Sequence, residues 1–306
     1  MPKEDFIAKL EAELNNDDLA DSTIERTLID ARQFEEWFKG TNGVQLDPDD
    51  VQIVSVDLRE YRGWLQQQDM TPGTIRRKFA SIRKSLMLID PKLALGLEWP
   101  KLPQQQQTSP SGFSRNERHS ILRAAEQLST RDEAIVKTLL YTGPRASSLA
   151  EAKLSNVVIN SRSGEITYDV TKTNREYSVP LNAEVRRALS AWIDERPPVD
   201  HGFLFCAERF PHRPISRHVV YNVWHERMRR RLPQPLADLI QGPHQARHDL
   251  ARRLLSGSEG RHAPVPAADA AAVLGMADPR VLVSTYSRPS EEDKRRALDR
   301  LVGDEE

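Results

Sequence analysis

The stretch that carries most of the information in this chain runs from residue 243 to residue 286 and reads PHQARHDLARRLLSGSEGRHAPVPAADAAAVLGMADPRVLVSTY. His244 and Arg247 are three residues apart, so on a helix they face the same way, one turn apart. The Leu274-Gly275 pair predicts a tight turn, and a single phenol, Tyr286, ends the stretch. Two basic side chains followed by a hydroxyl suit chemistry on a phosphate, although an exposed helix face and a packed tyrosine have the same composition. The rest of the chain has to decide between these interpretations.

The composition predicts a soluble, cytoplasmic protein of two domains. With 306 residues and 38% hydrophobic residues, the chain can bury a full core and is long enough for two domains. It has no apolar run of membrane-spanning length, and it begins without the pattern of a secretory signal. Cys206 is the only cysteine, which excludes an internal disulfide and a cysteine-based metal cluster and predicts a small buried hydrophobe.

The charge is unevenly distributed, although the formal net charge is only −1. Residues 1–97 hold 13 Lys/Arg and 18 Asp/Glu, and the remaining residues hold 31 and 27. A net charge near zero argues weakly against a nucleic-acid partner, but local basic clusters matter more than the sum.

The first hundred residues predict a helical domain. Ser22 and Glu25 form a capping-box pattern, helical spacing of apolar residues follows, and Gly40 is expected to end that helix. Further helices are predicted around residues 58–65 and after Thr71-Pro72. The last of these has an apolar stripe on one face, and its other face carries Arg76, Arg77, Lys78, Arg83 and Lys84. Five cations within nine residues of an acidic domain suit a helix that lies against DNA phosphates, although a solvated face is the simpler alternative.

A polar, Pro-bearing and aperiodic segment, about residues 98–113, predicts a linker between domains 1–108 and 114–306. Ser114 and Glu117 form a second capping-box pattern at the start of the next helix. Gly143 is expected to end a later helix, with Pro144 at the first position of the following one and Arg145 in its first turn. Free backbone N–H groups at that place favour an anion, although an ordinary helix corner with an exposed arginine fits as well.

Two alternating segments, residues 165–171 and 176–179, predict a β-hairpin with Lys172 at its tip. A tip lysine normally faces solvent, but a hairpin can also deliver its ammonium group into a neighbouring cleft. The strongly basic segment from residue 209 to 231 predicts a helix from about Ser216 and a second phosphate-facing surface, which includes Arg213, Arg217 and Arg227.

Five boxes in this order resemble those of the tyrosine recombinase (phage integrase) family, in its simple two-domain form. They are Thr142-Gly143-Pro144-Arg145, Lys172 eight residues before Pro180, His244-Gln245-Ala246-Arg247-His248, Leu274-Gly275, and Tyr286. Any one box is common by chance, but five in sequence within one domain are specific. The resemblance covers essentially the whole chain and is strongest from about residue 138 to 288.

The resemblance implies a mainly α fold with a small antiparallel β-sheet in an α+β catalytic domain, preceded by a helical domain that binds the core DNA site. It implies site-specific recombination of double-stranded DNA through a 3′-phosphotyrosyl intermediate, without metal or cofactor. Tyr286 would be the nucleophile, Arg145 and Arg247 would hold the phosphate, His244 would assist proton movement at the tyrosine, and Lys172 would protonate the 5′ oxygen.

The chain departs from the family pattern at several positions. Met276 stands where a His or Trp normally follows the Leu-Gly pair, and a thioether is a poor donor to phosphate. His262, in a loop longer than usual, is a candidate replacement. Ser148 and Pro144 also depart from the common residues, and the spacing from Met276 to the phenol is one residue longer than expected. The other candidate nucleophiles, Tyr168, Tyr177 and Tyr221, precede the second arginine and fit less well.

The resemblance also predicts self-association as a dimer or tetramer on DNA, with a helix after residue 290 that docks on a neighbouring protomer or packs on its own domain. In a prokaryote the protein would be associated with the nucleoid. Three alternatives remain open at this point: a related enzyme that cleaves and rejoins DNA strands, a catalytically impaired DNA-binding regulator, and a helical interaction protein with chance motifs.

Overall fold

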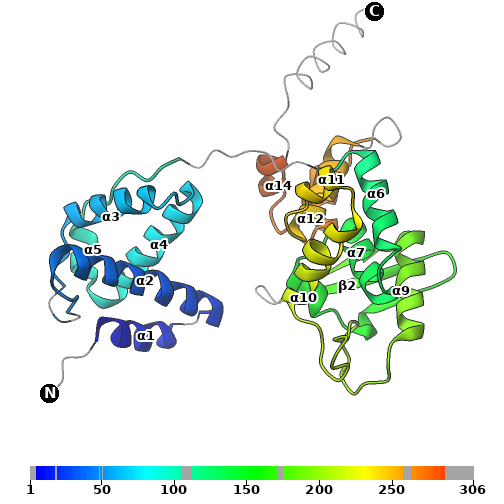
Figure 1. Ribbon diagram of the computed structural model, residues 1–306, viewed down its shortest axis with the longest axis horizontal. Helices are drawn as coiled ribbons and strands as arrows, with labels where there is room; N and C mark the ends of the chain where they lie inside the picture. The colour runs from blue at the N-terminus through cyan, green and yellow to red at the C-terminus, as the bar shows by residue number, and fades with distance from the viewer. Residues whose placement is uncertain are drawn as a thin grey trace, which may run out of the picture. The chain divides into compact units, whose positions relative to one another are not determined.

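Two compact units, Met1–Gln107 and Thr108–Glu306, divide the chain in the computed structural model (Figure 1). The structure describes residues 5–17, 19–47, 49, 51–104, 112–170, 175–257 and 263–286. Each unit has a hydrophobic core of its own. Within the described ranges, no helix is long and apolar enough to span a bilayer.

The first unit is entirely helical among its described residues apart from loops. Its helices are α1 Phe6–Asn16, α2 Asp21–Asn42, α3 Ser55–Gln67, α4 Pro72–Ile89 and α5 Pro91–Gly96. Aromatic residues from three of them meet in the core: Tyr61 packs edge-on against Phe34, with ring centroids 4.9 Å apart, and contacts Phe79 at 5.9 Å. Aromatic pairs of this geometry add to the free energy gained from burial alone, so they tie α2, α3 and α4 together.

Local signals predicted some ends of these helices correctly and missed others. Thr71 caps α4 and its hydroxyl accepts a hydrogen bond from the Thr74 N–H, as predicted. The capping box at Ser22 is wrong, because α2 begins at Asp21 and Ser22 lies inside the helix. The predicted stop at Gly40 is also wrong. The helix continues to Asn42 and ends at Gly43, whose φ of 72° is the left-handed conformation that ends helices.

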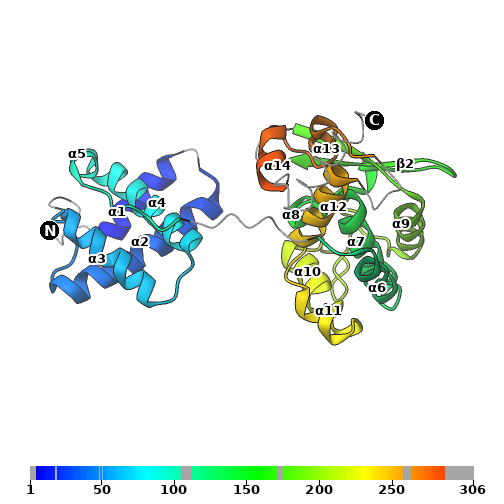
Figure 2. The same cartoon turned by 90° about the horizontal axis from the view of Figure 1, so that it is seen from above.

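The second unit combines helices with one small sheet (Figure 2). The strands β1 Val157–Ile159, β2 Gly164–Val170 and β3 Arg175–Pro180 form an antiparallel sheet in the order β1-β2-β3. In this register Tyr168 lies opposite Tyr177. The observed architecture confirms the predicted fold class, mainly α with a small antiparallel sheet, and the predicted hairpin. The tip of that hairpin, including Lys172, lies outside the described residues.

Helices surround the sheet and build most of the second core. The first group is α6 Arg115–Ala125, α7 Thr130–Thr142, α8 Ala146–Ala150, the 3-10 turn η1 Leu154–Asn156 and α9 Ala183–Glu195. Ser114 and Glu117 form the predicted capping box at the start of α6. The predicted position of Arg145 needs correction: α8 begins at Ala146, so Arg145 is the residue that precedes the first turn.

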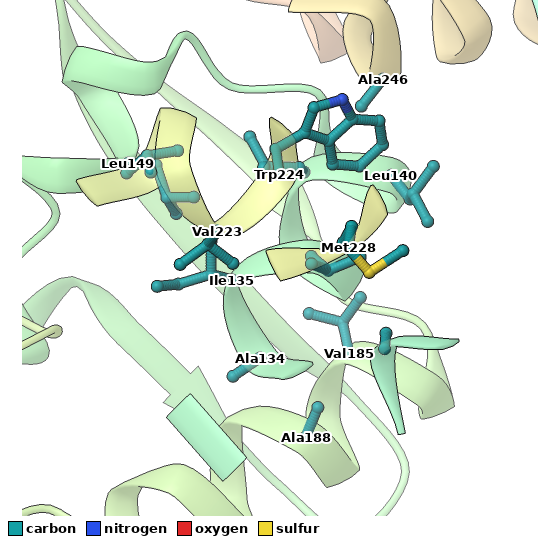
Figure 3. Packing of buried hydrophobic residues seen from close by; sticks show 14 of the residues in the cluster. Ala134, Ile135, Leu140, Leu149, Val185, Ala188, Val223, Trp224, Met228 and Ala246 are labelled. Carbon is teal, nitrogen blue, oxygen red and sulfur yellow. The ribbon is translucent and has the colours of Figure 1, made fainter. Parts of the chain in front are cut away.

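The sequence pattern predicted a regular helix in the basic segment after residue 209, and this prediction is wrong. It divides into α10 Arg217–Asn222, a π-helical turn η2 Val223–Arg227 and a 3-10 turn η3 Arg229–Arg231, before α11 Gln234–Leu239. The wider π turn accompanies the burial of Trp224 and Met228. Figure 3 shows Trp224 beside Ala246, in the same buried cluster as Leu140. Cys206 is buried as well, as predicted.

The last three described helices are α12 His244–Ser256, α13 Ala267–Val273 and α14 Pro279–Tyr286. Helix α12 contacts α7, α13 and α14 (Figure 2). It is therefore the element on which the candidate site converges. The predicted helix after residue 290 lies outside the described residues.

Candidate active site

Helix α12 presents three functional side chains on one face. His244, Arg247 and His248 follow the spacing i, i+3 and i+4, which places them together on an α-helix. The rings of His244 and His248 meet edge to face, with centroids 4.5 Å apart. Ala246 and Leu250, on the other side of the helix, are buried, so their packing fixes the direction in which the polar face points.

Arg247 is the anchor of the site. Its side chain is buried, with only 3% of the residue exposed. The guanidinium donates one hydrogen bond to the carbonyl oxygen of Gly143, 2.8 Å away, and another to that of Leu274, 2.6 Å away. Gly143 and Leu274 are the residues at the ends of α7 and α13, where carbonyl groups lack helical partners and carry partial negative charge. An arginine has five N–H donors, so donors remain for a ligand.

Two glycines make this close approach possible. Gly143 has φ +62°, and an added Cβ would lie 2.9 Å from the Leu250 side chain. Gly275 has φ +58°, and an added Cβ would lie 2.5 Å from the ring of Tyr177. Both the left-handed backbone and the lack of space exclude other residues at these positions without strain. The Leu274-Gly275 turn therefore packs directly on β3.

Arg145 completes a pair of guanidinium groups. Its side chain is exposed, whereas that of Arg247 is buried. Burial lowers the pKa of Arg247, and the nearby charge of Arg145 lowers it further. Among the described residues, neither arginine has a carboxylate partner within ion-pair distance. Two uncompensated cations, one of them desolvated, form a site for an anion with two or more oxygens.

The positive charge of the two arginines affects the pKa of two further groups, His244 and Tyr177. Burial lowers the pKa of His244, although its ring is still open to solvent on one side, and Arg247 and Arg145 lower it further. The Tyr177 hydroxyl is buried close to Arg247. Burial raises the pKa of Tyr177, and the charges of Arg247 and Arg145 oppose that rise. The Tyr177 oxygen therefore lies close enough to both arginines for their charges to act on it.

Tyr286, the last residue of α14, reaches the face of α12. Its hydroxyl forms a hydrogen bond with Nδ1 of His248, and the two ring centroids are 5.4 Å apart. Burial raises the pKa of Tyr286, and Arg247 opposes this increase. Burial, followed by the charges of His244 and Arg247, lowers the pKa of His248 to about 4. The imidazole of His248 is thus neutral near pH 7, with one ring nitrogen that can accept a hydrogen bond.

The structure thus brings together four of the residues proposed from sequence, Arg145, His244, Arg247 and Tyr286, and their roles remain predictions. Met276 lies on the apolar side of the site, where it packs against the small cluster that also contacts Tyr286. Lys172 and His262 lie outside the described residues. The other tyrosines are placed differently: Tyr168 is buried against Thr142, while Tyr221 is 43% exposed and stacks on His225.

Sequence reasoning gave His248 no role of its own and considered Tyr177 only as a less suitable nucleophile. The signal for His248 was its spacing of four residues from His244, which placed it on the same helix face. Tyr177 gave no local signal, because its relation to Gly275 depends on the packing of β3 against α13.

The basic face proposed on α4 needs correction. Lys78 is buried, with 6% of the residue exposed, and its ammonium donates to Asp30 and Gln33. Arg77 is also bonded to Asp30. These cations neutralise a buried carboxylate and hold α4 on α2, so they do not form part of an open phosphate-facing surface. Arg76 and Arg83 are exposed, and Lys84 lies 3.3 Å from Asp17.

The second basic surface needs a similar correction at one position. Arg227 donates to Asp132 at 2.6 Å and to Glu208 at 2.8 Å, so its charge is used within the fold. Arg213 and Arg217 are exposed. These two, with Arg76 and Arg83, remain as candidate DNA contacts, whereas Lys84 is paired with Asp17.

The class of protein follows from this arrangement. A mainly helical domain with a three-stranded sheet, in which a phenol lies near one of two arginines that have no carboxylate partner in the described part of the chain, is built like the catalytic domain of a tyrosine recombinase. The chain belongs to the phage integrase family: the model of that family matches residues 113–292, more than half of the chain.

Individual relatives and solved structures agree with this assignment. Tyrosine recombinase XerC of Myxococcus xanthus is 29% identical over 276 residues, which cover 83% of this chain and 84% of the relative. The fold is similar to that of the Tn1549 transposon integrase in complex with circular intermediate DNA, with a TM-score of 0.69 at 16% identity, covering 97% of this chain and all of that one. It is also similar to XerH site-specific recombinase bound to difH substrate, with a TM-score of 0.67 at 16% identity over 90% of this chain and 78% of the other.

Proposed function

We propose that this protein is a site-specific recombinase that cleaves and rejoins double-stranded DNA through a 3′-phosphotyrosyl bond to Tyr286. The observation that carries the proposal is the pair Arg145 and Arg247, which has no carboxylate partner among the described residues, with Arg247 close enough to the Tyr286 hydroxyl to shift its pKa. A phosphodiester supplies the missing negative charge, and the phenol supplies the nucleophile.

In the proposed reaction, a bond forms between Tyr286 Oη and phosphorus while the bond between phosphorus and the 5′ oxygen breaks. Charge that builds on the non-bridging oxygens is stabilised by the two guanidinium groups, and Arg247 is preorganised by its bonds to Gly143 and Leu274. The departing 5′ oxygen takes a proton from Lys172. The phosphotyrosine bond retains the energy for rejoining, so the reaction requires no nucleotide cofactor.

The two units receive different roles in this proposal. Residues 1–108 would hold the core DNA site and residues 114–306 would carry out catalysis, with the segment after Tyr286 docking on a neighbouring protomer in a dimer or tetramer. Support comes from structural neighbours that were solved on DNA, including the XerH complex with its difH substrate. We expect such a protein in the cytoplasm, and on the nucleoid if the cell is prokaryotic.

The test is covalent capture of DNA. Purified protein is incubated with a pool of nicked duplexes that carry randomised half-sites, and protein–DNA adducts are isolated on a denaturing gel and sequenced. We expect an adduct from the wild type, none from Tyr286→Phe, and an unchanged adduct from the matched control Tyr221→Phe. An adduct that survives in Tyr286→Phe would reject this nucleophile. Duplex binding on a native gel without any adduct would instead identify a DNA-binding regulator.

A further inference from the structure

The geometry points to His248 as a catalytic residue of the proposed strand cleavage: its Nδ1 accepts the hydrogen bond of the Tyr286 hydroxyl and takes the phenolic proton as the bond to phosphorus forms. This inference rests on the proposed function. It assigns to His248, to which the resemblance gave no role, the proton transfer that sequence reasoning gave to His244.

Contact geometry distinguishes the two histidines. The Tyr286 hydroxyl bonds to Nδ1 of His248, and the two rings lie 5.4 Å apart. Among the described residues, no hydrogen bond joins His244 to Tyr286. His244 instead packs edge to face on His248, one turn earlier on α12. A group that removes a proton must lie within hydrogen-bond reach of it, and in this structure only His248 of the two satisfies that condition.

The charges around His248 and Tyr286 determine which of the two donates the hydrogen bond. The groups that face His248 are His244 and Arg247 on its own helix and Tyr286 on α14. Both helix neighbours disfavour an imidazolium, and burial acts in the same sense. His248 is therefore neutral before DNA binds. A neutral imidazole with an unprotonated Nδ1 accepts a hydrogen bond from the phenol, which keeps its own proton because burial disfavours the phenolate.

Binding of the DNA phosphate makes proton transfer from Tyr286 to His248 more favourable. A phosphodiester placed at the arginine pair brings negative charge next to the cations that oppose protonation of His248, so its proton affinity rises. As Oη bonds to phosphorus, the phenol becomes strongly acidic and its proton passes to Nδ1. The separate proton that the 5′ oxygen receives comes from the proposed acid Lys172, and the reverse transfers occur on rejoining.

The first experiment observes the hydrogen bond without DNA. In protein with ¹⁵N-labelled histidine, we expect the neutral Nε2–H tautomer of His248 and an Nδ1 resonance shifted by its hydrogen bond. In Tyr286→Phe this resonance should move to the position of an unbonded imine nitrogen. An Nδ1–H tautomer in the wild type, or an unchanged resonance in Tyr286→Phe, would overturn the assignment.

The second experiment measures the proton transfer with a nicked duplex captured from the randomised pool. His248→Phe keeps a ring but removes the acceptor, and should slow adduct formation by about 10²-fold or more while duplex affinity is retained. His248→Asn keeps an acceptor oxygen near the position of Nδ1 but is not a base, so it should restore only part of the rate. His119→Asn, on the exposed face of α6, is the matched control and should match the wild type.

The outcomes separate the two proposals. Wild-type protein that forms no adduct with any duplex rejects the proposed function and the transfer with it, while the nitrogen resonance independently decides the hydrogen bond. Wild-type protein that forms an adduct, with His248→Phe reacting at the same rate, rejects only the role of His248. Thermal unfolding of each folded variant shows that a lost rate does not reflect lost structure.

Discussion

The Arg247 guanidinium donates a 2.8 Å hydrogen bond to the carbonyl oxygen of Gly143, the residue that ends α7. Gly143 lies two positions before Arg145, so the buried arginine holds the turn that places the exposed one. Arg247 and Gly143 are 104 positions apart in sequence. One contact thus ties Arg247 to the turn that precedes Arg145, the other cation proposed to hold the phosphate.

The two arginines should respond differently to replacement by lysine. An ammonium at position 247 lacks the planar fork that reaches Gly143 and Leu274 together. We expect Arg247→Lys to lower the free energy of unfolding by about 1–3 kcal/mol and the rate of adduct formation by about 10²-fold or more. Arg145→Lys should lower the rate without changing stability, because the Arg145 side chain is exposed. Urea unfolding and adduct kinetics measure both effects, and equal stability losses would contradict this division.

Gly275 should tolerate no side chain. A Cβ would collide with the Tyr177 ring at 2.5 Å, and the backbone has φ +58°. We expect Gly275→Ala to destabilise the second unit by about 1–3 kcal/mol. Gly202→Ala is the matched control in the same unit, because no atom lies within 4 Å of the added methyl group. Urea unfolding should show no comparable loss for the control, and a neutral Gly275→Ala would mean that the turn is not packed as described.

Asp30 should be essential for the first unit. Its carboxylate is fully buried and accepts hydrogen bonds from Arg77, Lys78 and Ser81. Asp30→Asn leaves the Lys78 ammonium buried without its counter-charge, and we expect a loss of about 3–5 kcal/mol. The double variant Asp30→Asn, Lys78→Met should recover part of that loss, since it removes the unpaired charge. Urea unfolding that is unchanged in Asp30→Asn would refute the buried ion pair.

The stability of the second unit should fall with acid because of His248. Its pKa is lowered from 6.5 to about 4 on folding. The unfolded state therefore binds a proton more readily, and the contribution is complete above pH 6.5 and disappears as the pH falls toward 4. Allowing for partial exposure of the ring, we expect about 1–2 kcal/mol from this residue. The stability difference between wild type and His248→Asn, measured by urea unfolding, should change between pH 7.5 and 4.5. A constant difference would contradict the lowered pKa.

Exposed cations of α4 should contribute to DNA affinity through phosphates. We expect Arg76→Ala to weaken binding to duplexes of any sequence and to reduce the slope of log affinity against log salt by about 1. Arg187→Ala is the control, because that exposed arginine is paired with Glu184 on α9. Fluorescence anisotropy over a salt series distinguishes them, and equal slopes for both variants would remove α4 from the proposed DNA surface.

Local sequence signals predicted the parts of the fold that depend on neighbouring residues. The Thr71-Pro72 start of α4 and the Ser114 and Glu117 capping box are confirmed, because caps join residues three positions apart. The same type of signal failed at Ser22 and Gly40, where packing of α2 extended the helix beyond its local boundaries. The exposed position proposed for Lys78 was wrong because its partner, Asp30, lies 48 residues away.

In the candidate site, too, some relationships between residues follow from local sequence and others only from tertiary packing. The sequence by itself determined that His244, Arg247 and His248 share one helix face, since helical geometry alone requires it. Only the tertiary structure decided which histidine meets Tyr286, because that contact joins α12 to α14 across 38 residues. It also decided that Arg247 is buried against two helix ends and that Gly275 lies on Tyr177. Such contacts depend on how the chain packs, and no periodicity along the sequence encodes them.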